Sequence, residues 1–211
     1  MLTISLISQK GGTAKTTTAV NLAVEATRAG YQAVIIDLDP QCSASEWKDL
    51  RGDRLPEVAA APVPHLSRVI KAAEGAGCQL AIIDTAGRNN DAALEAASAA
   101  DLVIIPMQGT FFDLKTLEAT LKVLRLSGGK RAVALITRVR TTSRKSDAER
   151  YLESKGIEVL TGALHERVEY QDSTARGLGV SESDETGKAA REFRKIWREI
   201  SILLALEPRS A

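Results

Sequence analysis

Six short apolar runs rich in β-branched residues recur along the chain, separated by longer alanine-rich segments. They lie at 2–8, 33–39, 80–86, 102–107, 132–138 and 157–164. Each run is apolar on both faces, which is typical of central strands in a parallel sheet covered by helices on both sides. Helical patterns occupy 16–29, 65–76, 90–99, 113–126, 143–155 and about 185–206. This alternation predicts an α/β fold with an open, doubly wound, mostly parallel sheet and helices on both faces.

Length and composition bound the class of protein. A chain of 211 residues can bury one sizeable core, and we expect a single domain over 1–211, with 51–64 as an extended, proline-rich connection. The 28 Lys and Arg residues nearly balance 27 Asp and Glu residues, so any contact with nucleic acid or membrane must use local patches. Cys42 and Cys78 form neither a CxxC pair nor a disulfide framework, and we therefore expect a cytoplasmic protein.

A glycine-containing loop directly follows the first predicted strand and precedes a helical pattern. It reads Gln9-Lys10-Gly11-Gly12-Thr13-Ala14-Lys15-Thr16-Thr17-Thr18. Glycines let backbone N–H groups turn toward phosphate oxygens, and the helix N-terminus adds partial positive charge. Lys15 can reach the β- and γ-phosphates of a nucleotide, and the Thr16 hydroxyl can bind Mg²⁺. The alternative is a glycine turn followed by Lys-Thr by chance.

The loop does not match the strict pattern GxxxxGK[ST], because Gln9 and Ala14 occupy its two glycine positions. It resembles instead the deviant Walker A motif, KGGxGK[ST], of the ParA/MinD family of P-loop ATPases, and similarity to this family runs from residue 2 to about 200. The resemblance implies ATP and Mg²⁺ as cofactors. It also implies nucleotide contacts from Lys10, Gly11, Gly12, Thr13, Ala14, Lys15, Thr16 and Thr17.

Lys10 is the lysine that marks this family, and we call it the signature lysine. In the family it reaches the phosphates bound by the opposite subunit, so the resemblance implies a homodimer that forms with ATP. A second cation at the transferring phosphate stabilises charge much as an arginine finger does. Ala14 departs from the family's usual glycine, which would cost about 1–2 kcal/mol if the loop needs a left-handed residue there.

Acidic residues end two of the predicted strands. Asp37 and Asp39 lie two residues apart on the same side of a strand end and match the family's DxDPQ segment. The resemblance implies that Asp39 positions the attacking water and Mg²⁺, with Asp37 in support; the alternative is a simple Asp-Pro turn. Asp84 ends an apolar run as a Walker B carboxylate does, beside a predicted switch at 85–90. No Glu or Gln follows Asp84, so we expect slow turnover.

The catalytic residues we predict are thus Lys10, Lys15 and Asp39, and the metal ligands are Thr16, Asp39 and Asp84. Further along, 135–138 resembles the strand whose end lines the adenine pocket, which implies nucleotide contacts from Thr137 and Arg138. The segment 164–182 resembles the second base-side loop and a helix at the dimer face. His65 and His165 stand alone, without the spacing of zinc ligands.

Two groups of cations are candidates for contact with the DNA backbone. The first basic cluster is Arg138, Arg140, Arg144 and Lys145; the second basic cluster is Lys188, Arg191, Arg194, Lys195 and Arg198. Four members of the second share one helix face. We predict DNA contacts from Arg140, Arg144, Lys145, Arg191, Arg194, Lys195 and Arg198. The alternative is a pair of solvated charged faces.

The last predicted helix also has an apolar stripe opposite its basic face. The stripe consists of Ile196, Trp197, Ile200, Leu203 and Leu204. Such a stripe normally docks a helix on the core. It is also what membrane attachment of the MinD type requires. We expect docking, and membrane is the less favoured partner.

The function predicted is that of a short ParA-type ATPase, since no helix-turn-helix region precedes the first predicted strand. Its ATP-bound dimer binds non-specific DNA on the nucleoid, and a separately encoded partner protein stimulates hydrolysis and release. This cycle positions a plasmid, a chromosome region or a protein cargo. The alternatives are a MinD-like membrane-associated ATPase, a poorly hydrolysing nucleotide-dependent regulator, and a metabolic P-loop enzyme.

Overall fold

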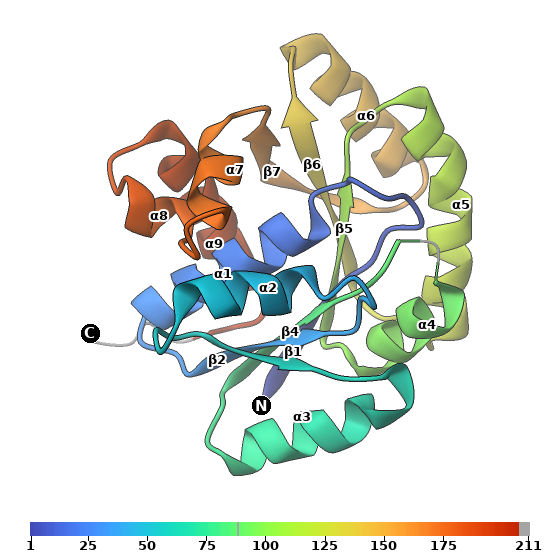
Figure 1. The fold of residues 1–211 in the computed structure, drawn as a ribbon. Helices are drawn as coiled ribbons and strands as arrows, with labels where there is room; N and C mark the ends of the chain where they lie inside the picture. The colour runs from blue at the N-terminus through green and yellow to red at the C-terminus, as the bar shows by residue number, and fades with distance from the viewer. Residues whose placement is uncertain (88, 207–211) are drawn as a thin grey trace.

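The computed structural model describes residues 1–87 and 89–206, and at 111–115 and 142–144 it describes the backbone alone. In this part of the chain, seven strands form one sheet. The strands are β1 (Leu2–Leu6), β2 (Ala33–Asp37), β3 (Glu57–Ala60), β4 (Leu80–Asp84), β5 (Leu102–Met107), β6 (Ala132–Val139) and β7 (Glu158–His165). Their order is β3-β2-β4-β1-β5-β6-β7, and all neighbours pair in parallel (Figure 1). The predicted doubly wound parallel sheet is confirmed.

Helices cover both faces of the sheet (Figure 1). They are α1 (Lys15–Arg28), α2 (Ser43–Arg51), α3 (Leu66–Gly75), α4 (Asn90–Ala99), α5 (Phe111–Leu126), α6 (Thr142–Ser154), α7 (Glu169–Thr174), α8 (Val180–Ser183) and α9 (Lys188–Leu203), with a 3₁₀ turn at Val63–His65. On one face Ile35 and Ile82 pack with Trp47 of α2 and Phe193 of α9. On the other, Val34 and neighbouring residues pack with α3 and α4, and β5 packs with α4 and α5.

The strands are apolar along their whole length because both faces are buried. Successive residues Ile35 and Ile36 of β2 belong to cores on opposite faces, and so do Ile82 and Ile83 of β4. All four side chains are inaccessible to solvent. Burying each stabilises the fold by roughly 1.5–3 kcal/mol, which explains why these strands were recognisable from the sequence.

Two predictions about the second quarter of the chain were incomplete. The segment 51–64 is not only a connection, because it contains the edge strand β3 paired with β2. Helix α2 was not predicted at all. Its Ncap is Cys42, which makes no side-chain capping bond, and only Ala44, Trp47 and Arg51 of the helix are buried. These features give a weak sequence signal.

The apolar stripe of the last helix docks on the core, as expected. Ile196 and Ile200 of α9 are fully buried, and Trp197 makes an edge-to-face contact with Tyr31 at 6.0 Å between ring centroids. The helix runs over Lys188–Leu203, slightly shorter than the predicted 185–206. None of the described helices is long and apolar enough to cross a membrane.

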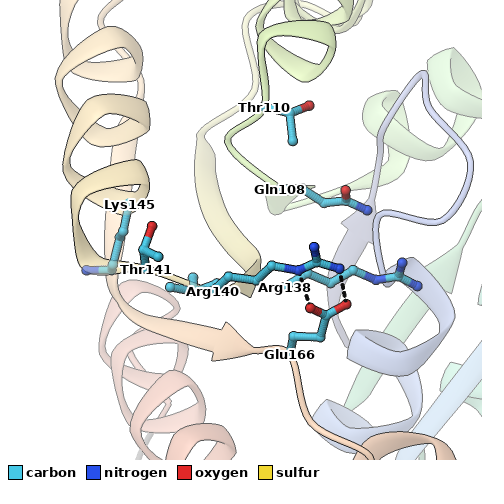
Figure 2. A pocket seen from close by; sticks show the side chains of 8 residues that line it. Gln108, Thr110, Arg138, Arg140, Thr141, Lys145 and Glu166 are labelled. Atoms are coloured by element: carbon cyan, nitrogen blue, oxygen red, sulfur yellow. Dashed lines mark hydrogen bonds and ion pairs between the residues drawn. The ribbon is translucent and has the colours of Figure 1, made fainter.

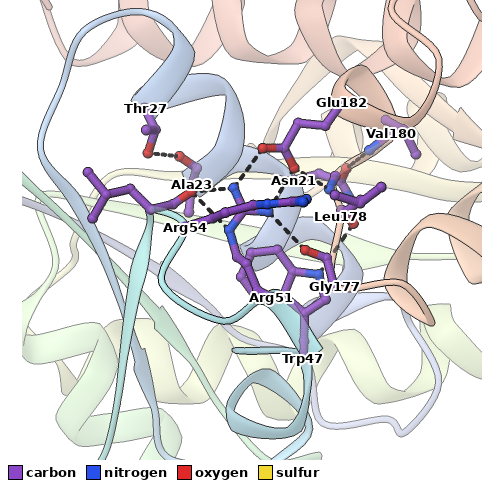
Figure 3. Close-up of polar contacts among 12 residues, drawn as sticks. Asn21, Ala23, Thr27, Trp47, Arg51, Arg54, Gly177, Leu178, Val180 and Glu182 are labelled. Atoms are coloured by element: carbon purple, nitrogen blue, oxygen red, sulfur yellow. Dashed lines mark hydrogen bonds and ion pairs between the residues drawn. The ribbon is translucent and has the colours of Figure 1, made fainter. Parts of the chain in front are cut away.

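A buried arginine ties α2 to the segment before α8. The Arg51 guanidinium donates to the two carboxylate oxygens of Glu182 at 2.6 and 2.8 Å and to the Gly177 carbonyl at 2.9 Å, and it stacks on Trp47 (Figure 3). The Trp47 indole N–H in turn donates to the Leu178 carbonyl. This network fixes residues 177–182 against α1 and α2.

Candidate functional site

The site lies where the carboxyl ends of the central strands meet. Leu6 at the end of β1 pairs with Asp84 at the end of β4, and Asp84 pairs on its other side with Asp37 at the end of β2. The loop of residues 7–14 leaves β1 at this edge and leads into α1. Parallel strand order therefore brings the predicted loop and both acidic segments together, in the crevice where open α/β sheets bind ligands.

The loop turns back on itself through two left-handed residues. Gly12 has φ 72° and Ala14 has φ 69°, so the predicted need for a left-handed residue at Ala14 is real. A non-glycine residue in this region is strained by roughly 1–2 kcal/mol. Lys15, the first residue of α1, is buried, and its ammonium donates to the Lys10 carbonyl at 3.3 Å. Burial lowers the pKa of Lys15, and the Asp84 and Asp39 carboxylates oppose this.

Side chains from neighbouring strands support the loop from behind. The Thr137 hydroxyl donates to the Thr13 carbonyl at 3.2 Å, and the Gln108 amide donates to the Gly12 carbonyl at 2.8 Å. Thr137 is fully buried, so its side chain supports the loop. Gln108 was not predicted. Its position just after β5, at the same edge of the sheet, is the signal that could have identified it.

Thr16 and Asp84 form the oxygen pair of the predicted metal site. The Thr16 hydroxyl donates to Asp84 Oδ2 at 2.6 Å, while Asp84 Oδ1 is buried and has no hydrogen-bond partner among the described residues. Burial raises the pKa of Asp84 to about 7. The Asp37 and Asp39 carboxylates also raise this pKa, whereas the hydrogen bond from Thr16 and the charge of Lys15 lower it. A buried, unsatisfied carboxylate oxygen beside a hydroxyl fits a hard cation.

The described residues contain no cluster of three or more His, Cys, Asp or Glu side chains that could hold a metal ion by itself. Mg²⁺ does not need one, because it usually binds one or two carboxylates together with substrate phosphates and water. The Thr16 hydroxyl and the Asp84 carboxylate therefore fit a magnesium ion that arrives with a nucleotide.

The two aspartates that follow β2 have different environments. Asp37 is buried, and its carboxylate accepts hydrogen bonds from the amides of Asp39, Ala44 and Ser45 at 3.0–3.1 Å. It thus caps the start of α2 from a distance and holds the intervening turn. Asp39 is half-buried and accepts from the Gln41 amide. The two carboxylates thus differ in accessibility: Asp37 is engaged by backbone amides, and Asp39 is the more exposed of the two.

A cavity of about 430 Å³ opens beside the first turn of α1. It is lined by Ala14, Thr17, Arg138, His165, Glu166, Arg167, Tyr170, Gln171, Thr174 and Ala175. Its far wall is held by Glu192 of α9, which accepts hydrogen bonds from His165, Arg167 and Tyr170 at 2.7–2.8 Å. His165 is thus an anchor of this wall.

A second cavity, of about 180 Å³, adjoins the first at the end of β6 (Figure 2). Figure 2 shows the Arg140 guanidinium facing the Glu166 carboxylate, with which it forms an ion pair. Arg138 lines both cavities and has φ 50°, at an irregularity in the pairing of β6 with β7. Left-handed residues other than glycine cluster at ligand sites, so Arg138 is well placed for the predicted contact.

One member of each basic cluster lines the same cavity in the structure. Lys145 of α6 and Lys195 of α9 line one cavity of about 230 Å³ beside β7. Several other members are engaged within the chain: Arg140 with Glu166, Lys145 with Glu149 at 2.6 Å, and Arg191 and Arg194 with the carbonyls of Thr186 and Glu185. Lys195 and Arg198 are exposed, and the side chain of Arg144 lies outside the described residues.

Comparisons with known proteins show the family of this chain. The model of the CobQ/CobB/MinD/ParA nucleotide binding domain matches residues 4–180. Maintenance of carboxysome distribution protein A of Gloeobacter kilaueensis is 31% identical over 202 residues, covering 94% of this chain and 91% of the relative. The chromosome-partitioning ATPase Soj of Thermus thermophilus is 25% identical over 238 residues, covering 93% and 94%.

Solved structures share the fold at lower identity. MinD of Pyrococcus horikoshii, complexed with Mg-ADP, superposes with a TM-score of 0.78 at 19% identity, covering 97% of this chain and 98% of that one. An ATP complex of Cyanothece McdA superposes with a TM-score of 0.74 at 16% sequence identity, covering 100% of this chain and 99% of that one. The chain therefore belongs to the CobQ/CobB/MinD/ParA family of nucleotide-binding domains, as one of its ParA/MinD-type P-loop ATPases, whose relatives act in partition and carboxysome distribution.

Proposed function

We propose that this protein is a ParA-like positioning ATPase that dimerises on binding ATP, binds DNA without sequence preference and releases it on hydrolysis. The observation that carries the proposal is that buried Lys15 and buried Asp84 lie beside Thr16, which donates to Asp84, in a loop that also holds a second lysine, Lys10. Its relatives in chromosome partitioning and carboxysome distribution support the same role.

Nucleotide binding starts from the loop. The amides of residues 11–16 and the N-terminus of α1 receive the phosphates. Lys15 leaves the Lys10 carbonyl and moves to the β- and γ-phosphates, which are stronger acceptors than a neutral carbonyl. Thr16 and Asp84 would hold Mg²⁺, which would neutralise phosphate charge. Base and ribose enter the cavity beside Ala14 and Thr17, with Arg138 at its edge.

Hydrolysis needs an oriented water and extra positive charge. Asp39, which faces the crevice, positions the water, while Asp37 holds the Asp39 amide in place. Lys10 supplies the charge to the phosphates of the opposite subunit in the dimer. No stronger base adjoins Asp84, so turnover is slow until a partner protein completes the site.

DNA contact is assigned to the surface around the cavity that one member of each basic cluster lines. Lys145 and Lys195 stand on different helices and line one cavity, and we assign phosphate contact to both; Lys145 would have to leave Glu149 to make it. Each phosphate neutralised this way releases counterions, and the affinity therefore falls steeply with salt. Dimerisation doubles this surface on one particle, which explains how a chain with net charge +1 would hold DNA only with ATP.

The proposal is tested by lysine variants with a matched control. Lys15→Ala should abolish tight ATP binding, whereas Lys10→Ala should retain ATP binding and lose ATP-dependent dimerisation. Lys71→Ala, on the exposed surface of α3, removes the same charge away from the site and should behave as wild type. Unchanged ATP affinity in Lys15→Ala, or normal dimerisation of Lys10→Ala, would contradict the assigned roles. Equilibrium nucleotide binding and sedimentation measure the two effects.

A second candidate function is a nucleotide-dependent regulator that hydrolyses ATP poorly. The left-handed conformation of Ala14 favours this alternative, because an alanine is strained there and the glycine that the family usually has at this position is not. ATP turnover with and without DNA and partner separates the two functions. The membrane alternative gains no support, since the apolar face of α9 is buried against the core.

A further inference from the structure

The segment after Asp84 lies in direct contact with the peptide that carries the signature lysine. A Cβ built on Gly87 would lie 3.0 Å from the Gly11 amide nitrogen, 3.1 Å from the Lys10 carbonyl carbon and 3.2 Å from the Gly11 Cα. All three are backbone atoms, which have no rotamer to change. Side chains larger than hydrogen therefore cannot occupy position 87 unless one of the two segments moves.

We propose that Gly87 is a positioning residue for Lys10: its missing side chain lets the Asp84–Gly87 segment set where the Lys10–Gly11 peptide lies. This inference rests on the proposed function, in which Lys10 acts on the phosphates of the opposite subunit. It concerns a contact that neither the loop motif nor the Walker B strand requires. The glycine thus links residues 85–87, the part of the predicted switch at 85–90 that precedes residue 88, to the lysine loop; residue 88 lies outside the described residues.

The 84–87 side of this contact is firmly anchored. The Thr85 hydroxyl is buried and donates to the Leu6 carbonyl at 2.7 Å, and Asp84 accepts the hydrogen bond from Thr16 at 2.6 Å. On the other side, Gly11 and Gly12 are exposed, while the carbonyls of Lys10, Gly12 and Thr13 accept hydrogen bonds from Lys15, Gln108 and Thr137. A methyl group added at Gly87 would therefore press on the Lys10–Gly11 peptide and shift it by a few tenths of an ångström.

The contact is asymmetric, which provides a matched control. A Cβ built on Gly11 meets nothing within 4 Å, and Gly11 is not left-handed. A methyl group added by Gly11→Ala therefore points into open space and not toward Gly87. Gly75→Ala, on α3 with no atom within 4 Å, tests the substitution elsewhere.

The first test needs no nucleotide. Hydrogen–deuterium exchange of a peptide covering residues 8–12 should be at least about fivefold faster in Gly87→Ala than in wild type, because the loop loses its packing contact with Gly87. Gly75→Ala, which adds the same methyl group outside the loop, should exchange as wild type. Equal exchange in Gly87→Ala and Gly75→Ala would overturn the inference. Failure of Gly87→Ala to fold would also overturn the inference, since the added methyl group would then have disrupted the core and not only the position of the loop.

The second test asks whether Gly87 acts through Lys10. A shift of a few tenths of an ångström at Lys10 should lower kcat for ATP hydrolysis about tenfold and leave KM within about twofold. The double variant Gly87→Ala/Lys10→Ala should then be no slower than Lys10→Ala alone, because both changes remove the same interaction. An additive loss in the double variant would show general damage and overturn the inference.

A wild-type measurement covers the case in which the variants are hard to prepare. On addition of Mg-ATP, exchange in 85–87 and in 10–12 should change together, and a change in one segment alone would overturn the inference. If wild type neither dimerises nor turns over ATP, the proposed function fails, while the nucleotide-free exchange comparison still decides the contact.

Discussion

Replacing Ala14 by glycine should stabilise the protein. Ala14 is the Ncap of α1 and has φ 69° and ψ 30°, a left-handed conformation that costs an L-residue with a Cβ about 1–2 kcal/mol. Glycine removes this strain but loses more conformational freedom on folding, which costs about 0.5–1 kcal/mol. The net gain in the free energy of unfolding is about 0–1.5 kcal/mol, with a midpoint of about 0.75 kcal/mol or about 1.5–3 °C in Tm for a chain of this size.

Urea unfolding of the nucleotide-free protein, followed by circular dichroism, measures this difference. The matched control is Ala72→Gly at an exposed position inside α3, where the backbone is helical. The same chemical change there should destabilise the protein by about 0.8–1 kcal/mol. The two substitutions should thus have opposite signs. If Ala14→Gly destabilises the protein as Ala72→Gly does, the left-handed conformation and the strain derived from it are wrong.

Three further predictions concern buried charges. Asp84→Asn should stabilise the metal-free protein increasingly as pH rises from about 4 to 7, and by a constant amount at higher pH. The pKa of Asp84 is raised to about 7 in the folded protein, so between these pH values the carboxyl ionises only in the unfolded chain. Urea titrations at several pH values measure the stability difference between variant and wild type, and a difference that does not change with pH would refute the prediction. Glu25→Gln should behave in the same direction, since burial also raises the pKa of Glu25 and stability is lost as pH rises above 4.5; identical pH profiles of variant and wild type would contradict this. Arg51→Ala should cost about 3–5 kcal/mol by leaving Glu182 without its partner, whereas Arg68→Ala on the exposed face of α3 should stay within about 0.5 kcal/mol; comparable losses would show that the ion pair is not the cause.

Features that depend on local sequence could be predicted, and those that depend on distant contacts could not. The central strands were recognisable because burial on both faces makes them uniformly apolar. The loop was recognisable because phosphate binding needs glycines, lysine and threonine in a fixed order. By contrast, α2 is capped by Asp37, six residues before its first residue, and Arg51 is paired with Glu182 from the other end of the chain.

The candidate site shows the same division. Lys15, Thr16 and Asp84 were predicted and lie together, since each follows a strand that ends at the same edge of the sheet. Gln108 was missed because a single polar residue after a strand has no motif around it. That Lys145 and Lys195 line one cavity depends on how α6 and α9 pack beside β7, which no local pattern contains.

The measurement that tests the proposed function most directly is DNA binding across a salt series with ADP, ATP and a slowly hydrolysed ATP analogue. Binding should appear only with the triphosphates, and its logarithm should fall linearly with the logarithm of salt concentration. Lys145→Gln and Lys195→Gln should each reduce that slope by about 1, while Lys71→Gln should not. Equal binding with ADP and ATP, or a slope unaffected by Lys145 and Lys195, would contradict an ATP-gated DNA surface at this site.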